Sequence, residues 1–377
     1  MKTILILGGY GNFGKRIVEN LTNLSNVKLL IAGRNFSKAQ DLIASMQDDP
    51  SPELEAVQLE AIQLDIFSES FEQQLLKLKP TLVIHTSGPF QGQDHRVAQA
   101  SINAGAHYID LADDRDFVCG INSLDEIAKS KNLLVVSGAS SVPGLSSTVI
   151  DHFNDQFSEI ESIDMAIAPG NKAERGEATI RGILSYTGHP FKVFKNAQWQ
   201  DSYGWMDSKR TDMGNQIGKR WLANVDVPDL ALFPERYQVK QRVTFQAGLE
   251  VSILHLTMVA MAWLVKKGLV KDWSPMTGLI AKTANWFNYF GTDKGGMQVV
   301  IKGKDHQGKN KSLTWRLFAD NGIGPYIPTI SAILIAKKLI AGDIKEFGAL
   351  PCLGLYQLSE FEDYVRDLDI FMEVIEA

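Results

Sequence analysis

The chain has 377 residues, more than one hydrophobic core usually serves, so we expect two domains. Hydrophobic residues make up 45% of the sequence and charged residues 22%, which is typical of a globular protein and excludes bulk disorder. A net charge of −6 without any block of lysine or arginine argues against nucleic acid as a partner.

The first half of the chain alternates short, β-rich apolar runs with helical patterns, as a doubly wound parallel sheet does. Strands are expected at residues 3–7, 27–32, 61–66, 81–86, 107–111 and 133–137. Helices are expected to begin near Phe13 and after Ser37 as N-cap, and to run over residues 95–105. A loop-like run follows the second helix at residues 48–52. The predicted fold class is therefore α/β, with a Rossmann domain at residues 1–145.

This regularity ends after residue 144. A short helix is expected at residues 146–157 and a strand at residues 163–168. Residues 297–303 and 313–319 alternate in strand fashion around a polar run, which predicts a β-hairpin. We expect an α+β domain at residues 146–322 that serves substrate binding or oligomerisation.

The longest apolar segment, residues 251–265, has 15 residues, fewer than the about 18 to 20 that span a bilayer. We expect a core helix or a helix at the interface of a homodimer. Peripheral contact with a membrane is the alternative, because Trp263 and the paired Lys266 and Lys267 also suit a lipid interface.

The cysteines and the N-terminus indicate the compartment. Cys119 and Cys352 are far apart and form no zinc-ligand spacing, so neither a disulfide framework nor a zinc site is expected. The apolar run after Met1 is too short for a signal peptide and is expected to form a strand. We expect a cytoplasmic protein.

A glycine-rich run at residues 8–14 directly follows the first strand and opens a helix. Glycines let the strand turn tightly and let the backbone approach a pyrophosphate, which the N–H groups of the helix then hold. The expected cofactor-binding residues are Gly9, Gly11, Asn12, Phe13 and Gly14. A strand-to-helix turn that binds nothing is the alternative.

The end of the second strand predicts NADP(H) rather than NAD as cofactor. An NAD enzyme normally places an acid there for the ribose 2′-OH, whereas this chain has Gly33, Arg34 and Asn35. We expect Gly33 to leave room for a 2′-phosphate and the Arg34 guanidinium to pair with it. Arg34 as a solvated surface residue and Asn35 as a turn residue are the alternatives.

The next two strand ends supply further cofactor candidates. Asp65 follows the third strand, where such folds often contact adenine. Ser87, Gly88, Pro89 and Phe90 follow the fourth strand, where we expect the loop next to the nicotinamide. Gly88 and Pro89 are also ordinary turn residues.

The fifth and sixth strand ends are expected to line the same crevice. Asp110 and Gly138 are the cofactor candidates there, and Asp113 and Asp114 are the catalytic candidates. Three carboxylates within five residues repel one another, so at least one should be exposed, hydrogen-bonded or raised in pKa. Helix capping by Asp113 or Asp114 is the alternative to acid–base catalysis.

In their order and spacing these motifs resemble the NADP-binding domain of the saccharopine dehydrogenase family. They are Gly9-x-Gly11-x-x-Gly14, Ala32-Gly33-Arg34, Gly88-Pro89-Phe90, Tyr108-x-Asp110 and residues 138–144 with Pro143. Residues 303–308 and 322–342 are similar to the family's hairpin and to a late helix that packs back on the first domain. Residues 170–290 match no motif.

The resemblance implies a Rossmann domain, an α+β domain, and a C-terminal segment at residues 323–377 that returns to the first domain. It also implies hydride transfer between NADP(H) and a C–N bond, as imine reduction or secondary amine oxidation of an amino-acid-like substrate. Cationic side chains would meet such a substrate. Among those of the second domain, Arg181 ranks first because it lies in an otherwise apolar helical pattern.

Two other functions are alternatives to this one. A short-chain-type carbonyl reductase requires a tyrosine followed four residues later by a lysine, and no tyrosine here has that lysine. A nucleotide-binding scaffold or membrane-surface protein without turnover is the other. The scattered histidines form no HxH or HxxxH cluster, so no metal is expected.

Overall fold

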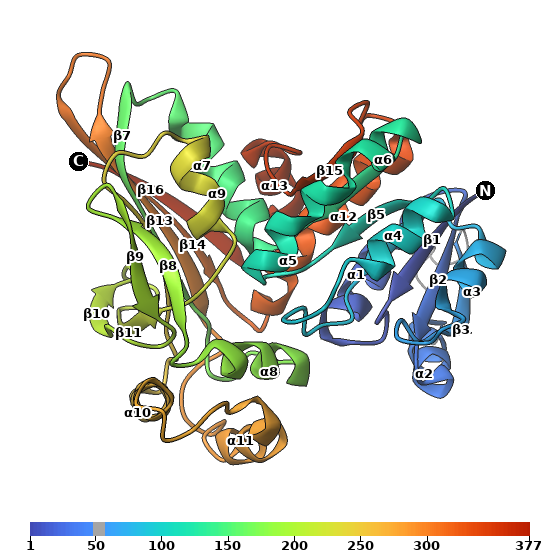
Figure 1. Cartoon of the computed structure of the whole chain (residues 1–377), viewed down its shortest axis with the longest axis horizontal. Coiled ribbons are helices and arrows are strands. Elements are labelled where there is room, and N and C mark those ends of the chain that lie inside the picture. Colours follow the sequence, from blue (N-terminus) through green and yellow to red (C-terminus); the bar gives the residue numbers. More distant parts are fainter. Residues whose placement is uncertain (48–56) are drawn as a thin grey trace. The chain divides into compact units, whose positions relative to one another are not determined.

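The computed structural model describes residues 1–47 and 57–377, and the loop expected at residues 48–52 lies outside this part of the chain. The chain divides into two compact units, each with a sheet of its own (Figure 1). The first unit comprises Met1–Gly144 and Tyr326–Tyr356, and the second comprises Leu145–Pro325 and Gln357–Ala377.

In the described residues, the first unit is built on a seven-stranded sheet with the order β15-β6-β5-β4-β1-β2-β3 and parallel pairing throughout. Its strands are β1 (Lys2–Leu7), β2 (Val27–Gly33), β3 (Gln58–Gln63), β4 (Leu82–His85), β5 (His107–Asp110), β6 (Leu134–Ser137) and β15 (Gly348–Pro351). The Rossmann prediction is confirmed.

Two strands differ from the expectations. β3 lies three residues before the predicted range, because this edge strand is only partly buried and its apolar residues do not mark its bounds. β15 was not predicted. It pairs with β6, which precedes it by some two hundred residues, so local periodicity carries no sign of it.

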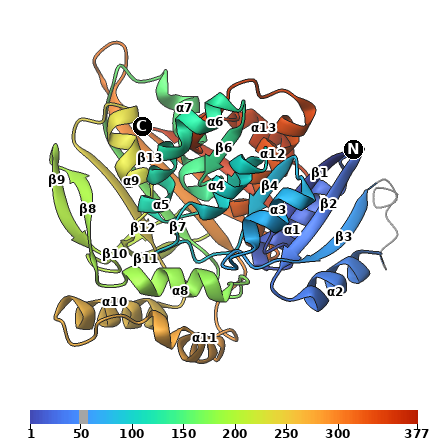
Figure 2. The same ribbon diagram turned by 45° about the vertical axis from the view of Figure 1, so that its right-hand side comes forward.

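Helices cover both faces of this sheet (Figures 1 and 2). They are α1 (Asn12–Leu21), α2 (Phe36–Gln47), α3 (Phe71–Leu78), α4 (Arg96–Asn103), α5 (Arg115–Gly120), α6 (Asp125–Ser130) and α12 (Ile327–Ala341). Leu5 and Leu7 of β1 belong to one apolar cluster with Phe71 and other residues of α3, α4 and α6. The alternate residues Ile4 and Ile6 are equally buried and point to the opposite face, which makes the sheet doubly wound.

α12 is the late helix that the family resemblance implied. Buried residues such as Ile330 and Ile333 lie along it, and it contacts α1. Tyr326, just before the helix, donates its hydroxyl to Glu19 Oε2 at 3.1 Å. The return of this helix to the first domain is confirmed.

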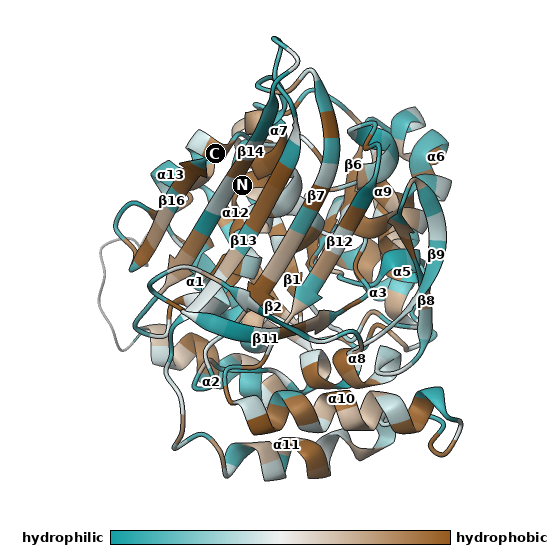
Figure 3. Cartoon of the chain, turned by 90° about the vertical axis from the view of Figure 1, so that its left-hand side faces the viewer, coloured by the Kyte–Doolittle hydropathy of each residue, from teal (hydrophilic) through white to brown (hydrophobic). Residues whose placement is uncertain are grey.

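The second unit contains a mixed sheet, nine-stranded in the described residues (Figure 3). Its strands are β7 (Glu159–Ala168), β8 (Pro190–Lys195), β9 (Gln198–Tyr203), β10 (Lys209–Asp212), β11 (Lys219–Asn224), β12 (Arg242–Ala247), β13 (Gly295–Lys304), β14 (Asn310–Ala319) and β16 (Ile370–Glu376). The path runs β10-β11-β12-β7-β13-β14-β16, and β8 and β9 branch from β12. β13 and β14 form the predicted hairpin.

The helices of the second unit are α7 (Ser146–Asn154), α8 (Glu177–Tyr186), α9 (Asp229–Arg236), α10 (Ser252–Lys266), α11 (Thr277–Asn285) and α13 (Leu358–Val365). α7 and α9 contact each other, and they pack on β13 and β12, respectively. Short turns of other helical types lie at Ile121–Leu124, Ser141–Leu145, Ser274–Met276 and Gly324–Tyr326. Across the described residues, no helix combines the length and the apolar character needed to cross a membrane.

The expectation that all of residues 323–377 return to the first domain is wrong for the last part. Residues 326–356 do belong to the first unit, but Gln357–Ala377 belong to the second. The reason is β16, which pairs antiparallel with β14 from Ala319↔Ile370 to Leu313↔Glu376. Backbone hydrogen bonding thus holds the C-terminus in the second sheet.

Candidate functional site

The glycine loop joins β1 to α1, and its backbone is packed too tightly for side chains. A Cβ on Gly14 would lie 2.2 Å from the carbonyl oxygen of Gly8, and one on Gly9 would lie 2.9 Å from Ile31 Cγ2. Gly8 has φ +76°, and its Cβ would lie 2.8 Å from the hydroxyls of both Thr86 and Ser87. These glycines let the start of α1 approach the end of β1 closely.

The N-terminus of α1 is open to an anion. Its N-cap, Gly11, has no side chain to accept from the first turn, and that turn contains no acidic residue. Asn12 turns its side-chain oxygen to the guanidinium of Arg16 one turn later. The N–H groups at this end carry a partial positive charge, as a phosphate site requires.

The end of β2 differs from the expectation at Gly33. The ring of Tyr10 lies over this glycine, so that a Cβ there would be 2.5 to 2.7 Å from three of its atoms. The Tyr10 hydroxyl also accepts the N–H of Asn35 at 2.9 Å. The space above Gly33 is therefore filled by Tyr10, and the expectation that it is empty room for a 2′-phosphate is wrong.

Arg34 and Asn35 lie at the start of α2. Asn35 Oδ1 accepts the N–H of Lys38 at 3.1 Å, so Asn35 caps α2 in place of the predicted Ser37. The Arg34 side chain is exposed. Together with the exposed Lys38, it makes this strand end cationic.

Asp65 follows β3 by two residues and shapes a local turn. Its Oδ1 accepts the N–H of Phe67 at 3.0 Å. The residue is half-buried, so its turn-forming role accounts for the contacts seen, and adenine contact stays a prediction.

The loop after β4 is tied to the glycine loop. The Thr86 hydroxyl lies 2.9 Å from the carbonyl oxygen of Leu7 and 3.2 Å from that of Gly8. Gln93 Nε2 donates to the carbonyl oxygens of Ser87 and Pro89 at 3.0 and 2.6 Å. The predicted residues 87–90 are thus brought next to the glycine turn.

His85, the last residue of β4, contacts the loop at residues 87–90. It is fully buried, and its Nδ1 accepts the N–H of Ser87 at 3.3 Å. Its ring meets Phe90 edge-on at 5.0 Å between centroids. Burial lowers the pKa of His85 to about 4, so the ring is neutral near pH 7.

Asp110 joins the ends of β5 and β6 through buried hydrogen bonds. Its side chain is fully buried, and Oδ1 accepts from the N–H groups of Ala112 and Gly138 and from the Ser137 hydroxyl at 2.8 to 3.0 Å. Burial raises the pKa of Asp110 to about 6, although these hydrogen bonds act in the opposite direction. These contacts position the two strand ends, and contact with the cofactor stays a prediction.

Gly138 is required by backbone packing. Its φ is +78°, and a Cβ would lie 2.6 Å from Pro143 Cδ and 3.2 Å from Val118. Because its N–H is used by Asp110, Gly138 serves to hold the ends of β5 and β6 together.

The structure separates the two catalytic candidates. Asp114 is the N-cap of α5 and accepts the N–H of Phe117 at 2.9 Å, as the helix-capping alternative stated. Asp113 caps nothing. It is half-buried, and its Oδ1 accepts from Gln91 Nε2 at 3.1 Å. Burial raises the pKa of Asp113 and of Asp114. Asp113 is therefore the stronger acid–base candidate.

Arg181 belongs to the second unit. Its side chain is exposed on α8 and pairs with Glu177, one turn earlier, at 3.6 Å. Arg220, another cation of the second unit, is partly buried in an ion pair with Glu250 at 2.9 Å. The exposed i,i+4 pair is the ordinary arrangement of a helix surface.

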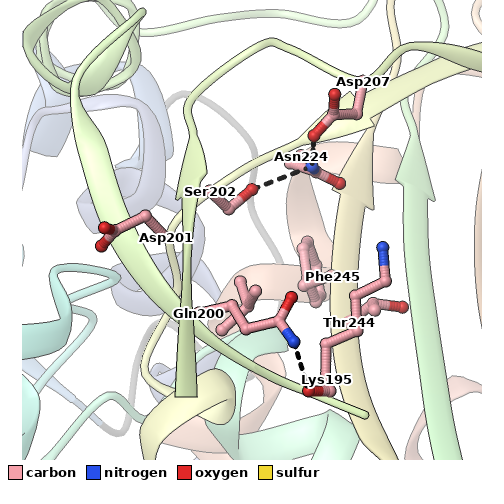
Figure 4. Close-up of a pocket in the computed structure, with 9 residues that line it drawn as sticks. Lys195, Gln200, Asp201, Ser202, Asp207, Asn224, Thr244 and Phe245 are labelled. Atoms are coloured by element: carbon pink, nitrogen blue, oxygen red, sulfur yellow. Dashed lines mark hydrogen bonds between the residues drawn. The ribbon is translucent and has the colours of Figure 1, made fainter. Parts of the chain in front are cut away.

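A small pocket in the second unit contains none of the predicted site residues (Figure 4). Asn224 Nδ2 donates to Ser202 and Asp207, and Gln200 donates to the Lys195 carbonyl oxygen. Its volume of about 90 Å³ is well below the roughly 300 Å³ at which small-molecule sites begin. The pocket is lined by Val193, Lys195, Gln200, Asp201, Ser202, Asp207, Asn224, Thr244 and Phe245. We place no cofactor or substrate there.

Sequence reasoning missed four residues that contact these loops: Tyr10, His85, Gln91 and Gln93. His85 could have been noticed as a polar residue at the end of an apolar strand. Tyr10 and Gln91 act through contacts with distant segments, as Gln91 does with Asp113, and Gln93 acts through the carbonyl groups of Ser87 and Pro89. In the described residues, no cluster of three metal-ligating side chains occurs.

Comparisons with known proteins match most of the first unit. Residues 4–136 match the family model described as the saccharopine dehydrogenase NADP binding domain. Among the curated proteins, no sequence matches the chain.

Two solved structures are similar over nearly their whole length. The first is apo histidine-tagged saccharopine dehydrogenase (L-Glu forming) from Saccharomyces cerevisiae, with a TM-score of 0.70 and 13% identity over 100% of both chains. The second is homospermidine synthase from Legionella pneumophila in complex with NAD. Its TM-score is 0.60 at 11% identity, over 100% of this chain and 91% of that one. At such identities the likeness is one of fold. The match of residues 4–136 confirms the family resemblance, since these residues resemble a nucleotide-binding domain of the saccharopine dehydrogenase kind, which takes a nicotinamide dinucleotide.

Proposed function

We propose that this chain is an NADP(H)-dependent oxidoreductase of saccharopine dehydrogenase-like type. It reduces an imine, or oxidises a secondary amine, of an amino-acid-like substrate. The observation that carries the proposal is the tightly packed glycine loop at the open N-terminus of α1, beside a β2 end with Arg34 and no acid. The match of residues 4–136 to an NADP binding domain supports it.

The residues present fit such a cofactor. Gly9, Gly11 and Gly14 would hold the pyrophosphate at the start of α1, since the lack of Cβ atoms lets this turn and helix pack closely on the end of β1. The exposed Arg34 would pair with the 2′-phosphate, and Tyr10 would form the wall of that site above Gly33. The loop at residues 87–90, braced by His85 and Gln93, would line the nicotinamide end.

A bound nicotinamide supplies or accepts a hydride at its C4 position. The chain itself has to manage the proton that accompanies a change in the C–N bond. Asp113 is suited to this task, because burial raises the pKa of its carboxyl group toward neutral pH, where the group can both donate and accept a proton. Gln91, through its hydrogen bond to Oδ1, orients that carboxyl group.

The cofactor is tested by titrating the protein with NADPH and with NADH, followed by cofactor fluorescence. NADPH should bind more tightly, and Arg34→Ala should remove that preference at a cost of about 1 to 3 kcal/mol. Arg366→Ala, an equally exposed arginine in the second unit, is the matched control and should change nothing. Equal affinities for both cofactors in the wild type would contradict the NADP assignment.

The reaction is tested with NADPH and a panel of amino acids, each combined with an aldehyde, by the loss of absorbance of the reduced cofactor. Turnover that requires both partners supports imine reduction. Tight NADPH binding with no turnover across the panel would favour a nucleotide-binding protein without catalysis.

A further inference from the structure

The helix α10 has two apolar faces, and the described residues cover only one of them. The covered face consists of residues that recur every three or four positions: His255, Met258, Ala262 and Val265. On the opposite face Ile253, Leu256 and Trp263 are 61%, 49% and 48% exposed. A helix that is apolar all round is normally buried on every side.

The exposed apolar surface continues beyond α10. Leu269 and Leu279 are 69% and 57% exposed, and after α11 Trp286, Tyr289 and Phe290 reach 77%, 90% and 58%. We call these eight residues, from Ile253 to Phe290, the α10–α11 face. In Figure 3, α10 and α11 lie together below β11, with hydrophobic turns along both helices. Exposed apolar side chains that are concentrated in one segment in this way are typical of an interaction site.

Hydrogen bonds of Glu250 and Asn171 fix the two ends of the segment that carries this surface. Glu250, just before α10, accepts the N–H groups of Asn171 and Thr292 at 2.8 Å each, and also the Thr292 hydroxyl at 2.9 Å. Asn171 Nδ2 in turn donates to the carbonyl oxygens of Phe287 and Phe290. The aromatic residues after α11 therefore project from an ordered backbone.

Within the segment that carries the face, residues 251–292, lysines outnumber acids, and Glu250 and Asp293 flank this segment. Residues 251–292 contain four lysines and one acidic residue, although the whole chain has a net charge of −6. That acid, Asp272, accepts two hydrogen bonds from Ser274, one from its N–H at 2.8 Å and one from its hydroxyl at 2.5 Å. Lys267 lies over the exposed Trp263 ring at 5.5 Å. Lysines at the border of an apolar surface favour an anionic partner.

We propose that the α10–α11 face rests on the surface of an anionic lipid bilayer. Tryptophan and tyrosine rings prefer the boundary between lipid and water, and lysines beside them contact anionic head groups while their stems cover apolar surface. Pairing of this face with its own copy would set lysines against lysines.

The test is flotation of the full chain with vesicles of phosphatidylcholine alone or mixed in equal parts with phosphatidylglycerol. The wild type should bind the anionic vesicles, and added salt should weaken this binding. Combined Lys267→Gln, Lys271→Gln and Lys282→Gln should weaken it about a hundredfold, at about fivefold for each lysine. The control set Lys240→Gln, Lys302→Gln and Lys309→Gln, exposed elsewhere in the second unit, should leave it unchanged.

A second variant tests the apolar contribution. Combined Leu279→Ser, Trp286→Ser and Tyr289→Ser should abolish vesicle binding while circular dichroism and NADPH titration stay at wild-type values, because these side chains are exposed. Absence of wild-type binding, or equal binding to neutral and anionic vesicles, overturns the proposal. The proposal is also overturned if the wild type is a dimer that does not bind vesicles and this variant is a monomer. That result would assign the face to contact with a second copy of the chain.

Discussion

Replacing Asp110 with asparagine should change how the stability of the first unit depends on pH. Burial raises the pKa of Asp110 from 3.8 to about 6, so the folded state binds a proton more tightly than the unfolded state does. Stability from this group is therefore fully present below pH 3.8 and is lost as pH rises through about 6. A pKa that differs by about two between the folded and unfolded states corresponds to about 3 kcal/mol.

The asparagine side chain would keep the interactions that position the loops. Its Oδ1 can still accept from Ala112, Ser137 and Gly138, and its amide group can still hydrogen-bond the neighbouring Tyr108 hydroxyl. Asparagine does not titrate. The difference in unfolding free energy, wild type minus Asp110→Asn, should fall by up to about 3 kcal/mol between about pH 4 and about pH 8.

Urea unfolding followed by far-ultraviolet circular dichroism measures this difference at each pH. The seven tryptophans lie between Trp199 and Trp315, all in the second unit. Their fluorescence therefore reports on that unit separately and should show no dependence on the substitution. A difference that stays flat with pH, or that grows as pH rises, would refute the claim that burial outweighs the hydrogen bonds at this carboxyl group.

Three further predictions concern the candidate site. Gly14→Ala places a Cβ 2.2 Å from the Gly8 carbonyl oxygen, so it should weaken NADPH binding at least about tenfold and lower stability by about 1 to 3 kcal/mol. Fluorescence titration and thermal unfolding measure the two effects. Gly33→Ala should displace the Tyr10 ring and weaken NADPH binding by a similar factor. The control Gly324→Ala, whose Cβ meets only one atom at 4.0 Å, should leave NADPH binding unchanged. Unchanged NADPH affinity in Gly33→Ala would show that Tyr10 is not part of the cofactor site. Asp113→Asn should lower kcat by about a hundredfold or more with NADPH affinity retained. Asp114→Asn can still cap α5 and should keep most of the activity. If steady-state kinetics show the larger loss of kcat in Asp114→Asn, Asp114 is the acid–base residue instead.

The Rossmann half could be predicted from the sequence because its signals are local. Strands buried on both faces consist of apolar residues almost throughout, as at Ile4–Leu7. The glycine loop depends on close contacts between Gly8, Gly9 and Gly14, which are near one another along the chain. The lack of an acid after β2 could likewise be read from a few adjacent residues. The same holds for the two candidates for the cap of α5, Asp113 and Asp114.

Tertiary structure decided the rest, because it depends on contacts between distant segments. Only packing shows that Tyr10 fills the space above Gly33, that β15 joins the first sheet, and that β16 joins the second. The sequence placed Asp110 at the end of a strand, but only the fold shows that it is fully buried and that three hydrogen bonds hold its Oδ1. In the same way, periodicity marks α10 as apolar, whereas which of its faces is covered follows only from the fold around it.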